Sequence, residues 1–135
     1  MPNTITNTRQ IAGTRNIVQY LTIVSDGSEE TDYLVYDSSA VATVIGISDP
    51  LDSTIKKVYA SLSAASTARA RLEFDADTDI LALDIPAGQI IDKDFREIGG
   101  LENTAGTGIT GDITLTTTGL ESGDLITIIL EVIPN

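Results

Sequence analysis

The chain has 135 residues with 20 acidic and 8 basic side chains, a formal net charge of −12, and no cysteine, histidine or tryptophan. Its length suits one domain, and the absent residue types exclude disulfides, thiolate nucleophiles, cysteine or histidine metal sites and imidazole bases. The acidic charge also speaks against nucleic acid as a partner, because such binding depends on lysine and arginine neutralising phosphates.

The composition predicts an all-β fold. The chain contains eighteen isoleucines, eighteen threonines and seven valines. These β-branched side chains are stiff at χ1 and pack best on a pleated sheet. No apolar run approaches the roughly 18 residues that a membrane span requires, so we also expect no membrane partner.

The N-terminal segment differs from the rest of the chain. Threonine, asparagine and isoleucine alternate there with too little apolar surface to offset the entropy of ordering. Arg9 and Arg15 are the only charged side chains before Asp26. We expect residues 1–15 to be an extended cationic arm and residues 16–135 to form the β-sandwich domain. The polar N-terminus lacks the apolar core of a signal peptide, so we expect synthesis in a cytoplasm.

Short apolar runs separated by turn residues follow from Asn16 onward, at the spacing of a sandwich or barrel. In the most regular run, Ala70, Leu72 and Phe74 alternate with charged side chains and are expected to face inward. The predicted strands cover residues 17–24, 31–37, 41–47, 55–62, 69–75, 79–85, 93–98, 112–118 and 124–133. About eight or nine strands of this kind predict a single antiparallel β-sandwich of jelly-roll type.

Several of these strands are apolar on both faces, although a two-sheet sandwich buries only one face of each sheet. In the last strand, Ile126 and Ile128 share one face, whereas Leu125 and Ile129 share the other. A loop, the arm or another subunit must cover the second face, and exposed apolar area of this kind usually marks an interface. Edge strands with unpaired backbone groups favour an oligomer too. The alternative is that long loops cover the second faces.

The segment 106–111 spells G-x-G-x-x-G, with an acid, Glu131, twenty residues after its last glycine. A dinucleotide-binding fingerprint needs a strand before the motif and a helix after it. Here a polar loop precedes and the alternating run 112–118 follows. The glycines therefore indicate a turning loop or a close backbone approach rather than a nucleotide site.

Asp75, Asp77 and Asp79 resemble the opening of a calcium loop, because carboxylates at alternate positions can converge on a hard cation. An EF-hand would need glycine and glutamate where Ile80 and Pro86 stand. A calcium site between strands stays open as an alternative. The simpler interpretation is a polar turn whose aspartates bond to nearby amides.

Only six aromatic side chains are present, and most lie within the strand patterns. A stacking platform for sugar rings requires exposed aromatics, so a carbohydrate-binding module is a secondary hypothesis. We expect no catalytic residue, no cofactor and no resident metal. Lys56, Lys57, Arg69 and Arg71 are interpreted as solvated faces or rim ion pairs.

The chain resembles small virion structural proteins of tailed bacteriophages, of the capsid decoration or cement type. The stretches that carry the resemblance are 72–75, 80–84, 94–96, 99–103 and the threonine-rich run 106–119. The resemblance implies a β-rich homo-oligomer, often a trimer, that binds the major capsid protein where capsomers meet, on the outside of the shell. When several copies bind together, weak individual contacts add up to tight attachment. An arm that becomes ordered on binding can reach a neighbouring subunit.

The sequence thus favours a capsid cement protein that self-associates and binds the shell through its arm and one glycine-rich loop. The alternatives are another virion part (tail, head–tail joining or fibre-associated) and a carbohydrate-binding or calcium-binding β-sandwich module. The expected contact residues are Arg9, Arg15, Gly99, Gly100, Leu101, Asn103, Gly106, Gly108 and Gly111.

Overall fold

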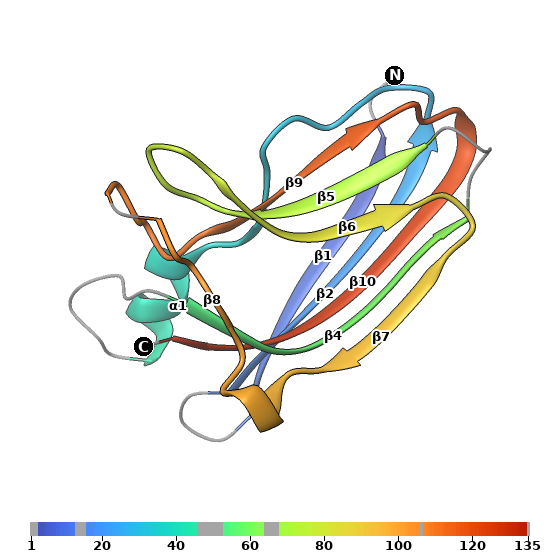
Figure 1. Ribbon diagram of the computed structural model, residues 1–135. Helices are drawn as coiled ribbons and strands as arrows, with labels where there is room; N and C mark the ends of the chain where they lie inside the picture. The colour runs from blue at the N-terminus through green and yellow to red at the C-terminus, as the bar shows by residue number, and fades with distance from the viewer. Residues whose placement is uncertain (1–2, 13–15, 46–52, 64–67, 106, 135) are drawn as a thin grey trace.

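The computed structural model describes residues 3–12, 16–45, 53–63, 68–105 and 107–134. These residues form two antiparallel sheets that pack face to face, with one short α-helix at an end of the sandwich (Figure 1). The predicted all-β sandwich is confirmed.

The larger sheet has the strand order β1-β2-β10-β4-β7, with β8 also paired to β4, and the smaller sheet has the order β3-β9-β5-β6. The strands of the large sheet are β1 (Thr4–Ala12), β2 (Asn16–Asp26), β10 (Ser122–Pro134), β4 (Ser53–Ser63), β7 (Ile90–Asp94) and β8 (Leu101–Glu102). The strands of the small sheet are β3 (Tyr33–Tyr36), β9 (Ile113–Thr118), β5 (Arg69–Phe74) and β6 (Ile80–Pro86).

The strand pairs show a jelly roll. β2 pairs with β10, β3 with β9, β4 with β7 and β5 with β6, all antiparallel, so the chain runs out and back as one long double ribbon. The ribbon is rolled so that β10 also pairs with β4, and β9 with β5. This wrapping gives a double-sheet jelly roll, to which β1 and β8 are additions.

The core lies between the two sheets and follows the period-2 alternation of the strands. Ile126, Ile128, Leu130 and Val132 of β10 are fully buried against the small sheet. From the small sheet, Ala70, Leu72 and Phe74 of β5 point inward, as predicted. The charged residues that alternate with them lie on the outer face, so the sequence pattern alone fixes the orientation of β5.

The segment expected as an N-terminal arm is extended and forms the edge of the large sheet. In β1, each residue from Thr4 to Ala12 pairs with β2, between Val24 and Asn16. Asn3, just before β1, bonds to the loop after β2 through the Asp26 N–H and the Ser28 carbonyl. Backbone pairing with β2 holds β1 although its own side chains are mostly exposed.

The prediction of a strand over 41–47 is wrong. Residues Ser38–Ile45 form the helix α1, and residues 46–52 lie outside the described parts. Asp37 caps the helix, because its carboxylate accepts hydrogen bonds from the backbone N–H groups of Ser39 and Ala40 at 3.1 and 3.2 Å. Val41 anchors α1 in the core, fully buried. The capping bonds and this anchor outweigh the β-propensity of the branched side chains.

Two other expectations also need correction. The run 93–98 is not one strand: β7 covers Ile90–Asp94, and a 3₁₀ turn, η1, covers Arg96–Ile98. In β3 the strict alternation fails, because the register shifts between Leu34 and Tyr36 and buries Val35 and Tyr36 side by side. A bulge places two consecutive residues where one is expected.

Candidate interaction surface

The outer face of the large sheet is uncovered in the described chain. No described strand or helix lies on the side of this sheet that faces away from the small sheet (Figure 1). Because alternate residues of each strand point outward, the sequence of β2, β10 and β4 decides what this face exposes. We call it the large-sheet face, and its central side chains are Val18, Tyr20, Thr22, Val24, Leu125, Thr127, Ile129, Glu131, Lys57, Tyr59 and Ser61.

The strand register arranges these side chains in rows. Ile129 of β10 lies opposite Tyr20 of β2 and opposite Tyr59 of β4, which makes one apolar row across three strands. Tyr20 is 41% exposed. A second row contains Val24 and Leu125, 45% and 38% exposed. Hydroxyl side chains lie between the two rows, so the face is flat and mixed rather than a continuous apolar patch.

A shallow hollow opens in this face. It has a volume of about 380 Å³ and is lined by Val18, Lys57, Tyr59, Asp92, Ile129 and Glu131. Lys57 lies opposite Glu131 on one side and opposite Asp94 on the other. The hollow therefore has an apolar floor and a rim that carries both signs of charge, with acids in excess.

Asp94 and Arg96 form a fixed ion pair at the rim. Arg96 Nε lies 2.9 Å from Asp94 Oδ1, and the guanidinium also contacts Oδ2. Hydrogen bonds from the Arg96 side chain and backbone hold the pKa of Asp94 well below its ordinary value.

Arg9, one of the expected contact residues, lies on β1 opposite Gln19 and is exposed. It lines a second hollow, of about 400 Å³, together with Asn7, Gln19, Leu34, Val35 and Asp37. Near it, burial raises the pKa of Tyr36 to about 12, and the Arg9 charge opposes that shift. Arg9 thus belongs to the edge between the two sheets rather than to the large-sheet face. Arg15, the other expected cation, lies outside the described residues.

The glycines of the expected contact loop are explained by packing within the chain. Gly100 has φ +96°, and a Cβ there would overlap the Thr54 side chain and lie 2.9 Å from the Ile55 carbonyl oxygen. Gly108 has φ +75°, and a Cβ there would overlap Asp77. Only glycine fits such positions without displacement. Gly99 and Gly111 also have positive φ, and Gly106 is not among the described residues.

The same loop is tied to the turn between β5 and β6. Asn103 is buried and donates from Nδ2 to the Asp75 carbonyl at 3.3 Å. The Thr110 hydroxyl donates to Asp75 Oδ2 at 2.8 Å. Leu101 packs half-buried against the core. As expected, the G-x-G-x-x-G segment is followed by a strand, β9, instead of a helix.

The sequence pattern identified part of this surface and missed the rest. The alternation within 55–62 is readable in the sequence, and in β4 it puts Tyr59 on the face opposite the core residues Val58 and Ala60. The exposure of Tyr20 was not evident, because β2 is apolar on both faces. The row that joins the two tyrosines depends on Ile129, and therefore on a pairing between distant strands.

No family model matches the chain, and comparisons with curated proteins and with solved structures give no match. Among the described residues, no helix has the length and hydropathy needed to cross a membrane.

Proposed function

We propose that this chain is a virion structural protein of the capsid decoration (cement) type, which associates with copies of itself and attaches to a phage shell. The observation that carries the proposal is the large-sheet face: Tyr20, Ile129 and Tyr59 form an apolar row that no described segment covers. Exposed apolar side chains gathered in rows and bordered by polar ones are typical of an interaction site.

The proposed occupant of this face is another copy of the chain, in a homotrimer. The rim around the hollow supports a second copy, because it carries Lys57 together with Asp92 and Glu131. A rim with both signs of charge can offer Lys57 to an acid, and an acid to a cation, of a neighbouring copy. In a trimer each contact is heterologous, so this face would meet a different patch of the neighbour. Flat rows of tyrosine, isoleucine and threonine are also compatible with an interface core, in which aromatic residues are enriched.

We assign attachment to the shell to the edge strand β1 and to the loop from Gly99 to Gly111. Arg9 on the edge strand β1 is an exposed cation on a chain of net charge −12. The loop from Gly99 to Gly111 exposes Ile109 at its far side, 39% accessible. Jelly rolls occur in viral capsid proteins, lectins and cupins alike, so the fold supports the proposal only by analogy.

The test is attachment to shells that lack this protein. Purified chain added to such shells is expected to bind in multiples of three and to raise the temperature at which the shells break. Arg9→Gln is expected to weaken attachment, and Lys93→Gln, an exposed cation on β7, serves as the matched control. A particle map with the protein in the tail, the head–tail joint or a fibre would assign it to another virion part. Unaltered shell stability together with no binding would contradict the proposal.

A carbohydrate-binding module is the second candidate, and one observation favours it. Tyr59 borders a hollow that also contains Asp92 and Glu131, which is the combination of a stacking face with hydrogen-bond acceptors that sugar rings require. A glycan array decides this point: binding that is lost in Tyr59→Ala and kept in Tyr33→Phe would support it, and an array without signal would eliminate it.

A further inference from the structure

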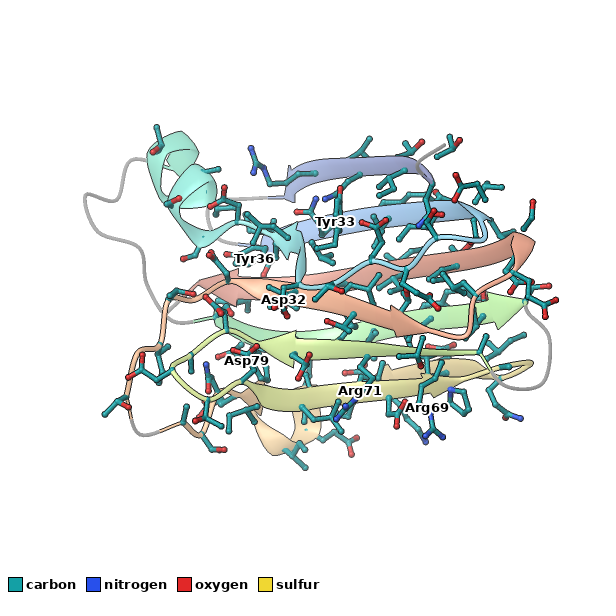
Figure 2. The ribbon with its side chains drawn as sticks, turned by 90° about the horizontal axis from the view of Figure 1, so that it is seen from above. Asp32, Tyr33, Tyr36, Arg69, Arg71 and Asp79 are labelled. Carbon is teal, nitrogen blue, oxygen red and sulfur yellow. The ribbon has the colours of Figure 1, made fainter. Side chains whose placement is uncertain are left out.

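The outer face of the small sheet gathers three carboxylates from distant parts of the chain. Asp32 precedes β3, Glu73 belongs to β5, and Asp79 lies just before β6. One carboxylate oxygen of each lies within 4.8 Å of those of the other two. Figure 2 shows Asp32 and Asp79 near the same end of the sheet, whereas Arg69 and Arg71 extend from β5 toward the other end.

No described cation neutralises this cluster. Arg69, on the same face, pairs instead with Asp84, with 3.1 Å between Nε and Oδ1. Arg71 precedes Glu73 by two residues on the outer face of β5, but it forms no ion pair with any of the three acids in the described chain. Like charges at such short distances repel one another, so the arrangement calls for a positive partner.

A buried hydroxyl under the cluster supplies independent evidence. Thr114 of β9 lies opposite Glu73 on one side and opposite Leu34 on the other. Its strand neighbours Ile113 and Leu115 point into the core, so the Thr114 side chain points outward, to the face that carries the acids. Yet Thr114 is only 6% exposed, and its Oγ1 has no hydrogen-bond partner among the described residues.

An unpartnered buried hydroxyl is costly, and the cross-strand neighbours of Thr114 on this face are Glu73 and Leu34. The Thr114 hydroxyl therefore lies beneath the outer face of the small sheet, beside Glu73, which is one of the three clustered acids. Oxygen-only donor sets of this kind suit hard divalent cations, and calcium accepts six to eight such ligands in flexible geometry, with water completing the shell.

We propose that Asp32, Glu73, Asp79 and Thr114 form a calcium-binding site on the outer face of the small sheet. An ion there would cross-link the start of β3, strands β5 and β9, and the β5–β6 turn. Asp32 is held against β9, because its backbone N–H donates to Thr116 Oγ1 at 3.0 Å and its Oδ1 accepts from the same hydroxyl at 3.4 Å. This inference is independent of the function proposed for the large-sheet face.

The site differs from the linear run of aspartates in the sequence. Of Asp75, Asp77 and Asp79, only Asp79 belongs to the cluster. Asp75 accepts a hydrogen bond from Thr110, and Asp77 lies against Gly108. Asp79 Oδ1 also accepts from the Ala76 N–H at 3.1 Å, which is the polar-turn geometry expected for this segment.

The test is calorimetric titration of the full chain with calcium chloride, repeated with magnesium chloride, together with thermal unfolding. We expect one calcium per chain, with a Kd on the order of 10⁻⁴ M or tighter. At about 100 times the Kd, calcium should raise the unfolding midpoint by about 10 °C. Magnesium should bind more weakly, because it demands near-ideal octahedral geometry and loses its water reluctantly.

Three variants locate the site. Glu73→Gln keeps the shape but removes one charge, so it should weaken calcium binding about tenfold or more while leaving the calcium-free midpoint unchanged or higher. Thr114→Val should also weaken binding without loss of calcium-free stability. Asp77→Asn, with the same change of charge in the same turn, is the matched control and should bind calcium as the unmodified chain does.

A titration without heat and without a shift in the unfolding midpoint would overturn the proposal. Binding that is lost in Asp77→Asn but kept in Glu73→Gln would also overturn it, because the ion would then occupy the linear run. If Thr114→Val binds calcium as tightly as the unmodified chain, the hydroxyl is not a ligand and the four-residue assignment is wrong.

Discussion

The outer face of the large sheet and the outer face of the small sheet arise from the same strand alternation but present different side chains. On the large sheet, β2 and β10 place Tyr20, Val24 and Ile129 outward. On the small sheet, β5 places Arg69, Arg71 and Glu73 outward. Both sheets bury their inner faces in one core, so the core does not require this difference.

The different side chains suit the two outer faces to different interactions. Charged side chains keep the small-sheet face in contact with water and leave carboxylates free for a cation. The large-sheet face instead exposes apolar rows that are more stable when covered. One side of the sandwich thus suits association, and the other suits solvent and ions.

The largest expected effect is on self-association, when a glutamate is introduced on the large-sheet face and, as a control, on the outer face of the small sheet. Ile129→Glu puts a carboxylate in the centre of the apolar row, and we expect it to weaken self-association by about 2 kcal/mol or more, a factor of about 30. Leu81→Glu changes an exposed residue of similar size on the small sheet and should leave association unaltered. Sedimentation of both variants over a range of concentrations checks this. Equal weakening in both would abolish the distinction between the faces.

The next test compares two buried threonines of β9. Thr117 accepts the Glu30 N–H at 2.9 Å and donates to Glu29 at 3.0 Å, whereas the Thr114 hydroxyl has no partner in the described parts of the chain. Thr117→Val should cost about 1–3 kcal/mol of unfolding free energy, and Thr114→Val should be neutral or stabilising in calcium-free buffer. Urea unfolding measures both. A cost in Thr114→Val similar to that in Thr117→Val would mean that the hydroxyl has a structural partner.

A smaller effect is expected at helix α1, which lies at one end of the sandwich (Figure 1). Asp37→Ala should cost about 1 kcal/mol, because the backbone N–H groups of Ser39 and Ala40 lose their acceptor. The hydrogen bond from the Ser39 side chain lowers the pKa of Asp37 below 3.8.

The sign of the pH dependence follows from that lowered pKa. A carboxyl whose pKa is lower in the folded state stabilises the protein above its ordinary pKa, and this contribution disappears as the pH falls through the folded value. The difference in unfolding free energy between the unmodified chain and Asp37→Ala should therefore be full at about pH 6 and smaller below about pH 3. A difference that grows on acidification would contradict the capping role.

The smallest effect is expected at the rim of the large-sheet face. Asp94 and Arg96 are both exposed, and an exposed ion pair contributes little to stability. Arg96→Gln should therefore leave the unfolding midpoint unchanged. Carboxyl chemical shifts followed during an NMR titration should show the pKa of Asp94 rising toward its ordinary value in this variant. An unshifted titration would show that Arg96 does not control Asp94.

The sequence predicted the strands whose two faces differ in chemistry. In β5, charged and apolar residues alternate, so both the strand and its orientation were predicted correctly. In the run 41–47, valine, isoleucine and threonine suggested a strand, and the helix was missed. The capping signal was nevertheless present in Asp37, Ser38 and Ser39, which precede the helix or begin it.

The sites could not be predicted from local pattern, because both depend on pairing between distant strands. The apolar row on the large sheet requires residues 20, 129 and 59 to lie side by side. The carboxylate cluster requires residues 32, 73 and 79 to meet above β9. The sequence indicated an excess of apolar side chains and a run of aspartates, but only the register shows which of them gather.

Light scattering of the purified, unmodified chain tests the central claim, that the large-sheet face joins copies of this protein. The account predicts a mass three times that of the 14.3 kDa chain at micromolar concentrations, falling to the single-chain mass in Ile129→Glu. A single-chain mass for the unmodified protein at every concentration would contradict it.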